Sequence, residues 1–280
     1  MSRPHTTERM SLIRTPDPFQ TQAARVAGVA LLLAIAIVVI ANYGISFRLV
    51  VPDNAVDTAR NITSHETLFR INIAGDLLYV VDLLVLAAAL YIVLKPANWL
   101  LALLAAFFRV VFALLWAVAA LEMLGALRLL GDAGYLPAFA TGQLHTLARL
   151  RISEAYDAYY IGLPFWGLAS TACSLLWLKS RYIPRGLAAY GVASSVWCVF
   201  CAFAFIALPH FDSTVNASLF DVPLVLFELA LGLWLLFRGL RTADSGASRA
   251  VAASRPPGRD RPRGPGPQGE AGPAASSPSL

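Results

Sequence analysis

Five ionisable residues stand within otherwise apolar stretches of the sequence: Asp76, Asp82, Arg109, Glu122 and Glu228. A charged side chain at the centre of a lipid bilayer costs about 2.5–3.5 kcal/mol even on permissive scales. Such residues therefore face a bundle interior, pair with one another, or bind protons and ions. These five are the residues of the chain whose type and position could do chemistry.

Polar residues form one stripe along the stretch that contains both aspartates. Asn72, Gly75, Asp76 and Tyr79 occupy positions i, i+3, i+4 and i+7, and Asp82 follows three residues later. This spacing places them on one face of a helix. We expect that face to point into a helical bundle, away from lipid.

Two oppositely charged pairs are matched in depth across a predicted helical hairpin. A tight turn at Lys95–Pro96 joins two apolar stretches, so residues at equal distances from it lie at equal depth. Asp82 and Arg109 meet this condition near the membrane centre. Arg70 and Glu122 meet it near the outer interface. The spacing predicts an ion pair within each of these two sets.

Asp76 and Glu228 then remain as intramembrane acids without a basic partner. A carboxyl group in such a place is expected to be neutral unless water reaches it. One interpretation is a pair of residues that bind protons or cations in a cavity. The alternative is structural, with protonated acids that form hydrogen bonds between helices.

The elements that must position these residues are transmembrane helices. Of the 280 residues, 58% are hydrophobic and only 14% charged, and the mean hydropathy is +0.63, which excludes a water-soluble globular protein. A span needs about 20 apolar residues. The sequence predicts six, in an all-α polytopic bundle: Val26 to Phe47, Thr67 to Leu94, Ala97 to Leu121, Ala155 to Leu178, Gly186 to Leu208 and Leu219 to Phe237.

The distribution of basic residues predicts that both termini are cytoplasmic. In a six-span arrangement most Lys and Arg residues fall on the side of the two termini, as the positive-inside rule expects of the cytoplasmic side. We divide the chain into a polar N-terminal lead (1–24), a six-helix transmembrane domain (25–241) and a Pro/Gly/Arg-rich tail (242–280). The composition of the tail predicts disorder.

Two connections on the predicted outer side are longer than a turn. They run from Pro52 to Glu66 and from Thr141 to Glu154. Each has the pattern of a short amphipathic helix that lies at the membrane interface.

The chain resembles a bacterial integral-membrane family catalogued as domain of unknown function 4386. The resemblance covers about Ala24 to Arg241 and is most specific at the SHETLFR segment and the hairpin that follows it, with further matches at RVAGVALLL, YYIGLPFWGL and ELALGLWLLFRGLR. Asp76, Asp82, Arg109 and Glu228 match acidic and basic positions of similar sequences. The resemblance implies a six-helix membrane protein in a bacterial cell membrane. It implies no activity, substrate or cofactor.

The inventory of residues argues against several cofactors. All four histidines lie outside the predicted spans, so the bundle offers no pair of haem ligands and no buried zinc cluster. Neither Lys95 nor Lys179 is at mid-membrane, which excludes a retinal Schiff base of the usual kind. His65, His145 and His210 could form a surface zinc site, but solvent-facing histidines are the favoured interpretation. We therefore expect no cofactor and no metal.

Two functions remain open. The first is a small proton- or ion-coupled transport or permeability protein that uses Asp76 and Glu228. The second is a non-enzymatic membrane scaffold or regulatory subunit whose buried ion pairs are structural. The sequence shows no nucleophile with a base and an orienting group, which argues against an enzyme. It has no nucleic-acid-binding module either, so the expected partner is the lipid bilayer. It does not identify a protein partner, a solute or an oligomeric state.

Overall fold

The computed structural model describes residues 17–241, apart from 133, 135, 209–210, 212–214 and 216, and for 217–219 it describes the backbone alone. The predicted tail, residues 1–16 of the predicted lead, His5 and His210 lie outside the described residues. The chain divides into two units, Met1–Ala243 and Asp244–Leu280, and all described residues belong to the first.

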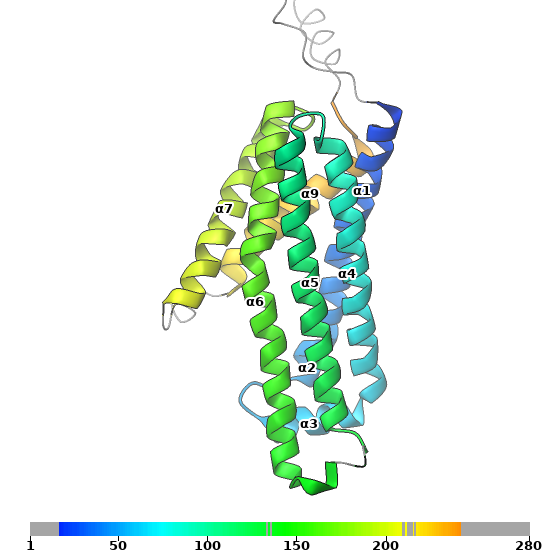
Figure 1. Cartoon of the computed structure of the whole chain (residues 1–280), viewed down its shortest axis with the longest axis vertical. Helices are drawn as coiled ribbons and strands as arrows, with labels where there is room; N and C mark the ends of the chain where they lie inside the picture. Colours follow the sequence, from blue (N-terminus) through cyan, green and yellow to red (C-terminus); the bar gives the residue numbers. More distant parts are fainter. Residues whose placement is uncertain are drawn as a thin grey trace, which may run out of the picture. The chain divides into compact units, whose positions relative to one another are not determined.

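The described part of the chain is helical and contains no strand. Its elements in chain order are α1 (Pro18–Val38), the π-helix η1 (Val39–Ser46), α2 (Phe47–Leu49), α3 (Ala55–Ser64), α4 (Glu66–Leu94), α5 (Trp99–Leu129), the 3-10 helix η2 (Leu136–Ala138), α6 (Thr141–Ser180), α7 (Arg185–Ala207) and α9 (Ala217–Phe237) (Figure 1). Six helical runs are long and apolar enough to cross a membrane, which confirms the six predicted spans. The first run is continuous from Pro18 to Leu49, so it begins before the predicted start at Val26.

The six long helices pack in a closed order. Each contacts the next in the sequence α1, α4, α5, α6, α7 and α9, and α9 returns to contact α1. In this order α5 and α9 stand opposite each other, as do α1 and α6. Side chains that point inward from all six helices therefore share one interior.

Local sequence signals explain where two of the long helices begin. The Asp17 side chain accepts a hydrogen bond from the backbone N–H of Phe19, and Pro18 occupies the first turn of α1, where its missing N–H costs nothing. Asn98 caps α5 by accepting bonds from the N–H groups of Leu100 and Leu101, both at 3.1 Å. This cap follows the predicted turn directly and fixes the α4–α5 hairpin.

The predicted interfacial helix at the start of α6 is instead part of that helix. Residues from Thr141 to Glu154 continue without interruption into the span, and α6 reaches 40 residues. At 1.5 Å per residue this is about 60 Å, roughly twice the thickness of a hydrocarbon core. The sequence from Gln143 to Ile161 contains neither Gly nor Pro, so nothing ends the helix there. Its first half packs against α3 and α5.

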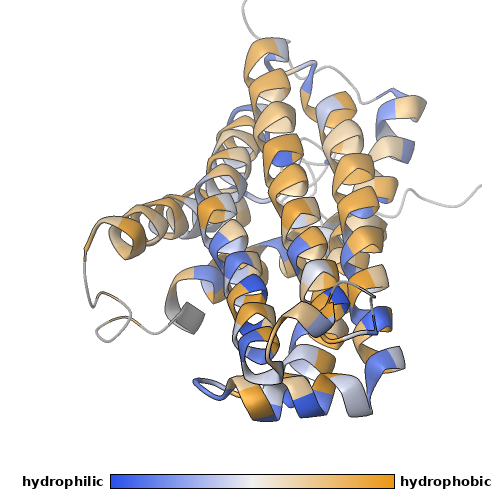
Figure 2. Ribbon diagram, turned by 60° about the horizontal axis from the view of Figure 1, so that its bottom comes forward, coloured by the Kyte–Doolittle hydropathy of each residue, from blue (hydrophilic) through white to orange (hydrophobic). Residues whose placement is uncertain are grey.

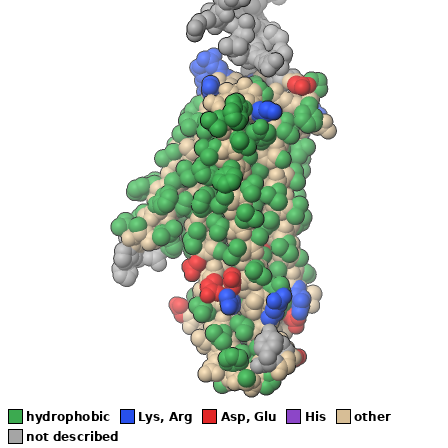
Figure 3. Space-filling model, viewed as in Figure 1, with side chains coloured by type: hydrophobic (Ala, Val, Ile, Leu, Met, Phe, Trp, Pro, Cys, Tyr) green, Lys and Arg blue, Asp and Glu red, His purple; other side chains and the backbone are tan. Residues whose placement is uncertain are grey.

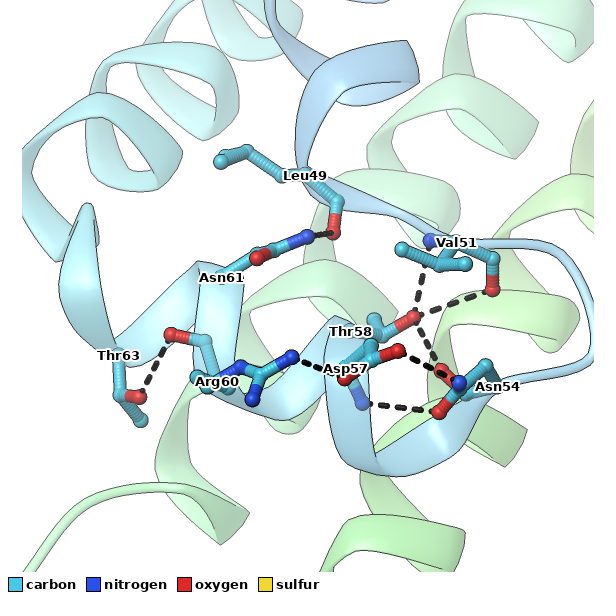
Figure 4. A network of polar contacts seen from close by, with 8 residues as sticks. All are labelled: Leu49, Val51, Asn54, Asp57, Thr58, Arg60, Asn61 and Thr63. Atoms are coloured by element: carbon cyan, nitrogen blue, oxygen red, sulfur yellow. Dashed lines mark hydrogen bonds and ion pairs between the residues drawn. The ribbon is translucent and has the colours of Figure 1, made fainter.

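The helix predicted within Pro52 to Glu66 is present as α3, which lies across the long helices near one end of the bundle (Figure 1). Thr58 receives a hydrogen bond from the N–H of Val51 at 3.0 Å, and Asn54 caps the helix by accepting from the N–H of Asp57 at 2.9 Å (Figure 4). The Asn61 side chain donates to the carbonyl of Leu49 at 3.4 Å. These bonds fix α3 to the end of the first transmembrane run.

The surface of the bundle fits a membrane. Hydrophobic side chains cover the middle of the visible face, and charged side chains gather toward the two ends (Figure 3). Hydrophilic residues are concentrated at the end of the bundle where α3 lies (Figure 2). The opposite end is held by a bond from Gln20 Nε2 to the carbonyl of Val93 at 2.7 Å and by one from the N–H of Arg241 to the carbonyl of Tyr182 at 2.9 Å. We treat the apolar middle as the lipid-facing region.

Candidate functional site

A buried ion pair crosses the interior between the two opposite helices α5 and α9. Arg109, only 2% exposed, donates from Nη2 to Oε1 of Glu228 at 3.0 Å. Glu228 is 7% exposed. The pair joins residues that are more than a hundred positions apart in sequence.

Two side chains of α6 complete the surroundings of Glu228. Trp166 Nε1 donates to Glu228 Oε1 at 2.9 Å, and Ser170 Oγ donates to the same oxygen at 3.0 Å. Ser170 Oγ also accepts from Arg109 Nη2 at 3.2 Å. One carboxylate oxygen thus receives three donors, one of them a permanent cation. We call Arg109, Trp166, Ser170 and Glu228 the arginine cluster.

The helices around the arginine cluster are tightly packed. A Cβ atom added to Gly191 would lie 2.5 Å from the Phe227 ring and 2.6 Å from Ser174 Oγ. One added to Gly28 would lie 2.8 Å from the backbone nitrogen of Leu236. These glycines let α7 and α1 approach α9 closely, as small residues do in membrane bundles.

A second polar cluster surrounds Asp76 on α4. Its Oδ1 accepts from Trp116 Nε1 at 3.1 Å, and its Oδ2 accepts from Asn72 Nδ2 at 3.4 Å. Asn72 Oδ1 in turn accepts from Ser46 Oγ, on η1, at 3.3 Å. All four side chains are buried, and no described cation forms an ion pair with Asp76. We call Ser46, Asn72, Asp76 and Trp116 the aspartate cluster.

The backbone beside the aspartate cluster is less tightly packed. The first transmembrane run changes from α-helix to π-helix over Val39–Ser46, and Ser46 is the last residue of this π-helix. A Cβ added to Gly75 would lie 3.7 Å from Ala41 Cβ and 3.9 Å from Ile37, which are ordinary contact distances. π-Helical turns are rare and frequently accompany functional sites.

Tyr79 and Asp82 follow Asp76 along the polar stripe of α4. Asp82 is 6% exposed, and its Oδ2 has no hydrogen-bond partner among the described residues. The charge of Arg109 attracts its carboxyl group. The Tyr79 ring packs edge-on against Trp116 with centroids 4.6 Å apart, and it interacts electrostatically with Arg109 and Glu228. The predicted polar stripe of α4 thus does face the interior.

The ion pairs differ from those that depth matching predicts. Arg109 forms its ion pair with Glu228, which the sequence left without a basic partner, and not with Asp82. Depth matching fixes height but not the direction in which a side chain points around the helix. The opposite helix α9 presents its acid where the guanidinium points.

The predicted outer pair is also replaced by other contacts. Arg70 pairs with Glu66 one turn away on α4 at 2.7 Å. Glu122 pairs with Arg151 at 2.9 Å, because α6 continues past α5 at this height. Arg151 further contacts Glu154 at 3.0 Å. The Arg70 side chain is 61% exposed, so it points outward and not toward Glu122.

Several polar partners lack an obvious signal in the sequence. Trp116, Trp166 and Ser170 are of residue types that are common in membrane helices, and Trp usually lies at a membrane–water interface. Their positions at i and i+4 on one face of α6 could have identified Trp166 and Ser170 as a polar pair. A further contact, from Tyr159 Oη to Asp221 Oδ2 at 3.0 Å, ties α6 to α9 nearer the α3 end.

Neither cluster forms a metal site. Within the part of the chain that the structure describes, no three His, Cys, Asp or Glu residues come together in a way that could hold an ion. Cys173, Cys198 and Cys201 are free and buried. His210, one member of the possible surface zinc site, lies outside the described residues.

A surface hollow in the described structure is separate from both clusters. It is a groove of about 520 Å³ between the start of α4 and the end of α5. Its charged lining consists of Glu66, Arg70, Arg128 and Asp132. None of the interior acids lines this groove.

Comparison with known proteins identifies one family. A family model described as domain of unknown function (DUF4386) matches residues 26–239, which include all six spans except the first turns of α1. No curated protein and no solved structure matches the chain. The family match agrees with the six-span architecture and assigns no function to either cluster.

Proposed function

The chain belongs to the family described as domain of unknown function (DUF4386) and is a multi-pass membrane protein. We propose that it moves protons or small cations across the membrane, and that Asp76 is the group that binds and releases them. One observation carries the proposal. Asp76 is a buried carboxyl group held by neutral donors alone, whereas the other acid in the predicted pair, Glu228, has a cation against it. A buried carboxylate without a counter-charge is costly, and binding a proton removes that cost.

The partners of Asp76 suit both of its protonation states. An indole N–H only donates, so the Trp116 bond always falls on an accepting oxygen, Oδ1. The amide of Asn72 can present either its NH₂ or its oxygen to Oδ2 after a half-turn about its last torsion. Ser46, beyond Asn72, can donate or accept. The aspartate cluster can therefore lose or gain one proton without leaving a polar group unpaired.

The balance of charge in the interior supports the same role. Asp76, Asp82 and Glu228 are three buried acids, and Arg109 is the one basic residue buried with them in the described structure. Acids in excess of their counter-ions favour uptake of protons or cations from water. Under this proposal Glu228 is no longer a carrier but the fixed counter-ion of Arg109.

Flux through purified protein tests the proposal directly. Proteoliposomes that contain a pH-sensitive dye are given a potassium gradient and valinomycin, and the resulting proton movement is recorded. We expect Asp76→Asn, which keeps the size of the side chain, to lower the flux at least about tenfold. Glu154→Gln, in an exposed ion pair on α6, is the matched control and should leave the flux unchanged. Equal flux in wild type, Asp76→Asn and protein-free vesicles would refute the proposal.

A second candidate function is supported by the arginine cluster. Its ion pair and three further hydrogen bonds connect α5, α6 and α9 across the interior. Buried ionic groups can specify the register of helices. A scaffold or regulatory subunit needs that rigidity and no flux. A stoichiometric protein partner recovered from mild detergent, together with absent flux, would favour it.

We also propose that both termini face the cytoplasm of a bacterial cell. The two ends of the described chain lie at the same end of the bundle as the α4–α5 and α6–α7 turns, which carry Lys95, Lys179, Arg181 and Arg185. Reporter fusions after Arg241 test this: green fluorescent protein should fluoresce, and alkaline phosphatase should stay inactive.

A further inference from the structure

Arg109 has more hydrogen-bonding capacity than the arginine cluster uses. Its Nη2 serves Glu228 and Ser170, while Nε and Nη1 are fully buried and have no partner among the described residues. An unpaired buried donor of a charged group is costly. A guanidinium placed in this way calls for a second acceptor.

An acceptor without a partner lies on the neighbouring helix. Asp82 Oδ2 is buried and has no hydrogen-bond partner among the described residues, and the carboxyl group interacts electrostatically with Arg109. Asp82 lies 12 residues before the last residue of α4 (94 − 82), and Arg109 lies 10 residues after the first residue of α5 (109 − 99), so the two are at similar depths. The unpaired acceptor of Asp82 and the unpaired donors of Arg109 thus lie on adjacent helices at similar depths.

Several small side chains lie beside the guanidinium. Arg109 lines a shallow crevice together with Ala87 of α4 and Ala102, Ala105 and Ala106 of α5. The crevice does not admit a water-sized sphere, and Asp82 does not line it, so a change of partner by Arg109 requires neighbouring side chains to move.

We propose that Arg109 serves two carboxylates in turn, Glu228 in the structure described here and Asp82 in a second state of the same bundle. In the second state Nη1 donates to Asp82 Oδ2, and Glu228 keeps its bonds from Trp166 and Ser170. No covalent bond changes, and the cation always has a counter-ion. The exchange makes Asp82 a positioning residue for Arg109, and it holds whether or not Asp76 carries protons.

Other charged or titratable groups around Arg109 do not offer the same partner. Cys173 approaches from α6 and Tyr79 from α4, and both interact with the guanidinium electrostatically. Neither is an anion at neutral pH under ordinary conditions. Asp76 is engaged by Trp116 and Asn72. Asp82 is the remaining buried carboxyl group on a helix packed directly against α5.

A double-mutant cycle measured by thermal unfolding in detergent tests the exchange. Glu228→Gln keeps a neutral acceptor for Trp166 and Ser170, and Asp82 then becomes the counter-ion of Arg109. We expect the Asp82→Asn/Glu228→Gln double variant to lose at least about 5 °C of Tm beyond the sum of the two single losses. The matched cycle with Asp76→Asn in place of Asp82→Asn should be additive. Additivity in both cycles would overturn the proposal.

Two further observations decide the case if the double variant does not fold. Adding Arg109→Gln to it removes the lone cation and should restore a folded protein. The structure of the single Glu228→Gln variant, which keeps Asp82, should show an Arg109 nitrogen about 3 Å from Asp82 Oδ2. An arginine that still points only toward residue 228 in that variant would refute the exchange. None of these results depends on proton flux, so they can fail independently of the proposed function.

Discussion

The two polar clusters inside this bundle satisfy their buried acids in different ways. Glu228 is fixed by a cation and two neutral donors, among helices that approach so closely that glycine is required. Asp76 has neutral donors alone, beside a π-helical turn and a glycine that has room around it. Burial of an acid therefore does not by itself define its role. Under the proposed function, the compensated acid in the tight site holds helices together, and the uncompensated acid in the looser site exchanges a proton.

Replacement of each acid by leucine should separate the clusters most strongly. Glu228→Leu leaves the Trp166 N–H and Ser170 O–H without an acceptor and takes the bound counter-ion from Arg109, so we expect a loss of about 3–5 kcal/mol in the free energy of unfolding. Asp76→Leu leaves only neutral donors without an acceptor and should lower the free energy of unfolding by about 1–3 kcal/mol. Unfolding by SDS in mixed micelles, followed by tryptophan fluorescence, measures both. Equal losses would remove the distinction.

The two serines provide a smaller and closely matched comparison. Ser170 contacts two charged side chains, so Ser170→Ala should cost about 1.5–3 kcal/mol. Ser46 donates a hydrogen bond to the neutral Asn72 amide, so Ser46→Ala should cost about 0.5–1.5 kcal/mol. The same SDS titration applies. A larger loss at Ser46 would show that the aspartate cluster is the more important structural element.

Glycine substitutions test the packing half of the comparison. Gly28→Ala would place a methyl group 2.8 Å from the backbone of α9, which cannot move as a side chain can, and should cost about 1–2 kcal/mol. Gly75→Ala meets ordinary contacts and gains helix propensity, so its stability should be unchanged or up to about 1 kcal/mol higher. Thermal unfolding of the two variants in one detergent checks the opposite signs. A stabilising Gly28→Ala would show that α1 and α9 are not tightly packed.

The smallest effect is expected at the exposed end of the bundle. Arg70→Gln removes an ion pair whose side chains are more than half exposed, and it should change stability by less than about 1 kcal/mol. The measurement is again SDS unfolding, with Glu228→Leu as the buried reference. A loss comparable with that reference would mean that Arg70 supports more than its contact with Glu66.

Sequence patterns predicted the spans well because the signal is local. Apolar length located all six helices, and the spacing of Asn72, Asp76 and Asp82 predicted an inward face on α4. The same reasoning failed for the start of α6. An amphipathic pattern there resembles an interfacial helix, but the chain contains no residue that would end the helix, so it continues.

The partners of the buried charged residues could not be predicted from local sequence patterns. Depth along a hairpin follows from counting residues, which is why Asp82 and Arg109 could be placed at one height. The choice between Asp82 and Glu228 depends on how six helices close on one another, which brings α9 opposite α5. Trp166 and Ser170 acquire their roles only through that arrangement.

Hydropathy and residue type are properties of short segments, so they are enough to predict a six-span membrane protein with more acids than bases in its interior. Which of the acids has a counter-ion depends on the packed fold. A hydrogen bond requires position and direction within a few tenths of an ångström, and for residues as distant in sequence as Arg109 and Glu228 only the packed bundle supplies both.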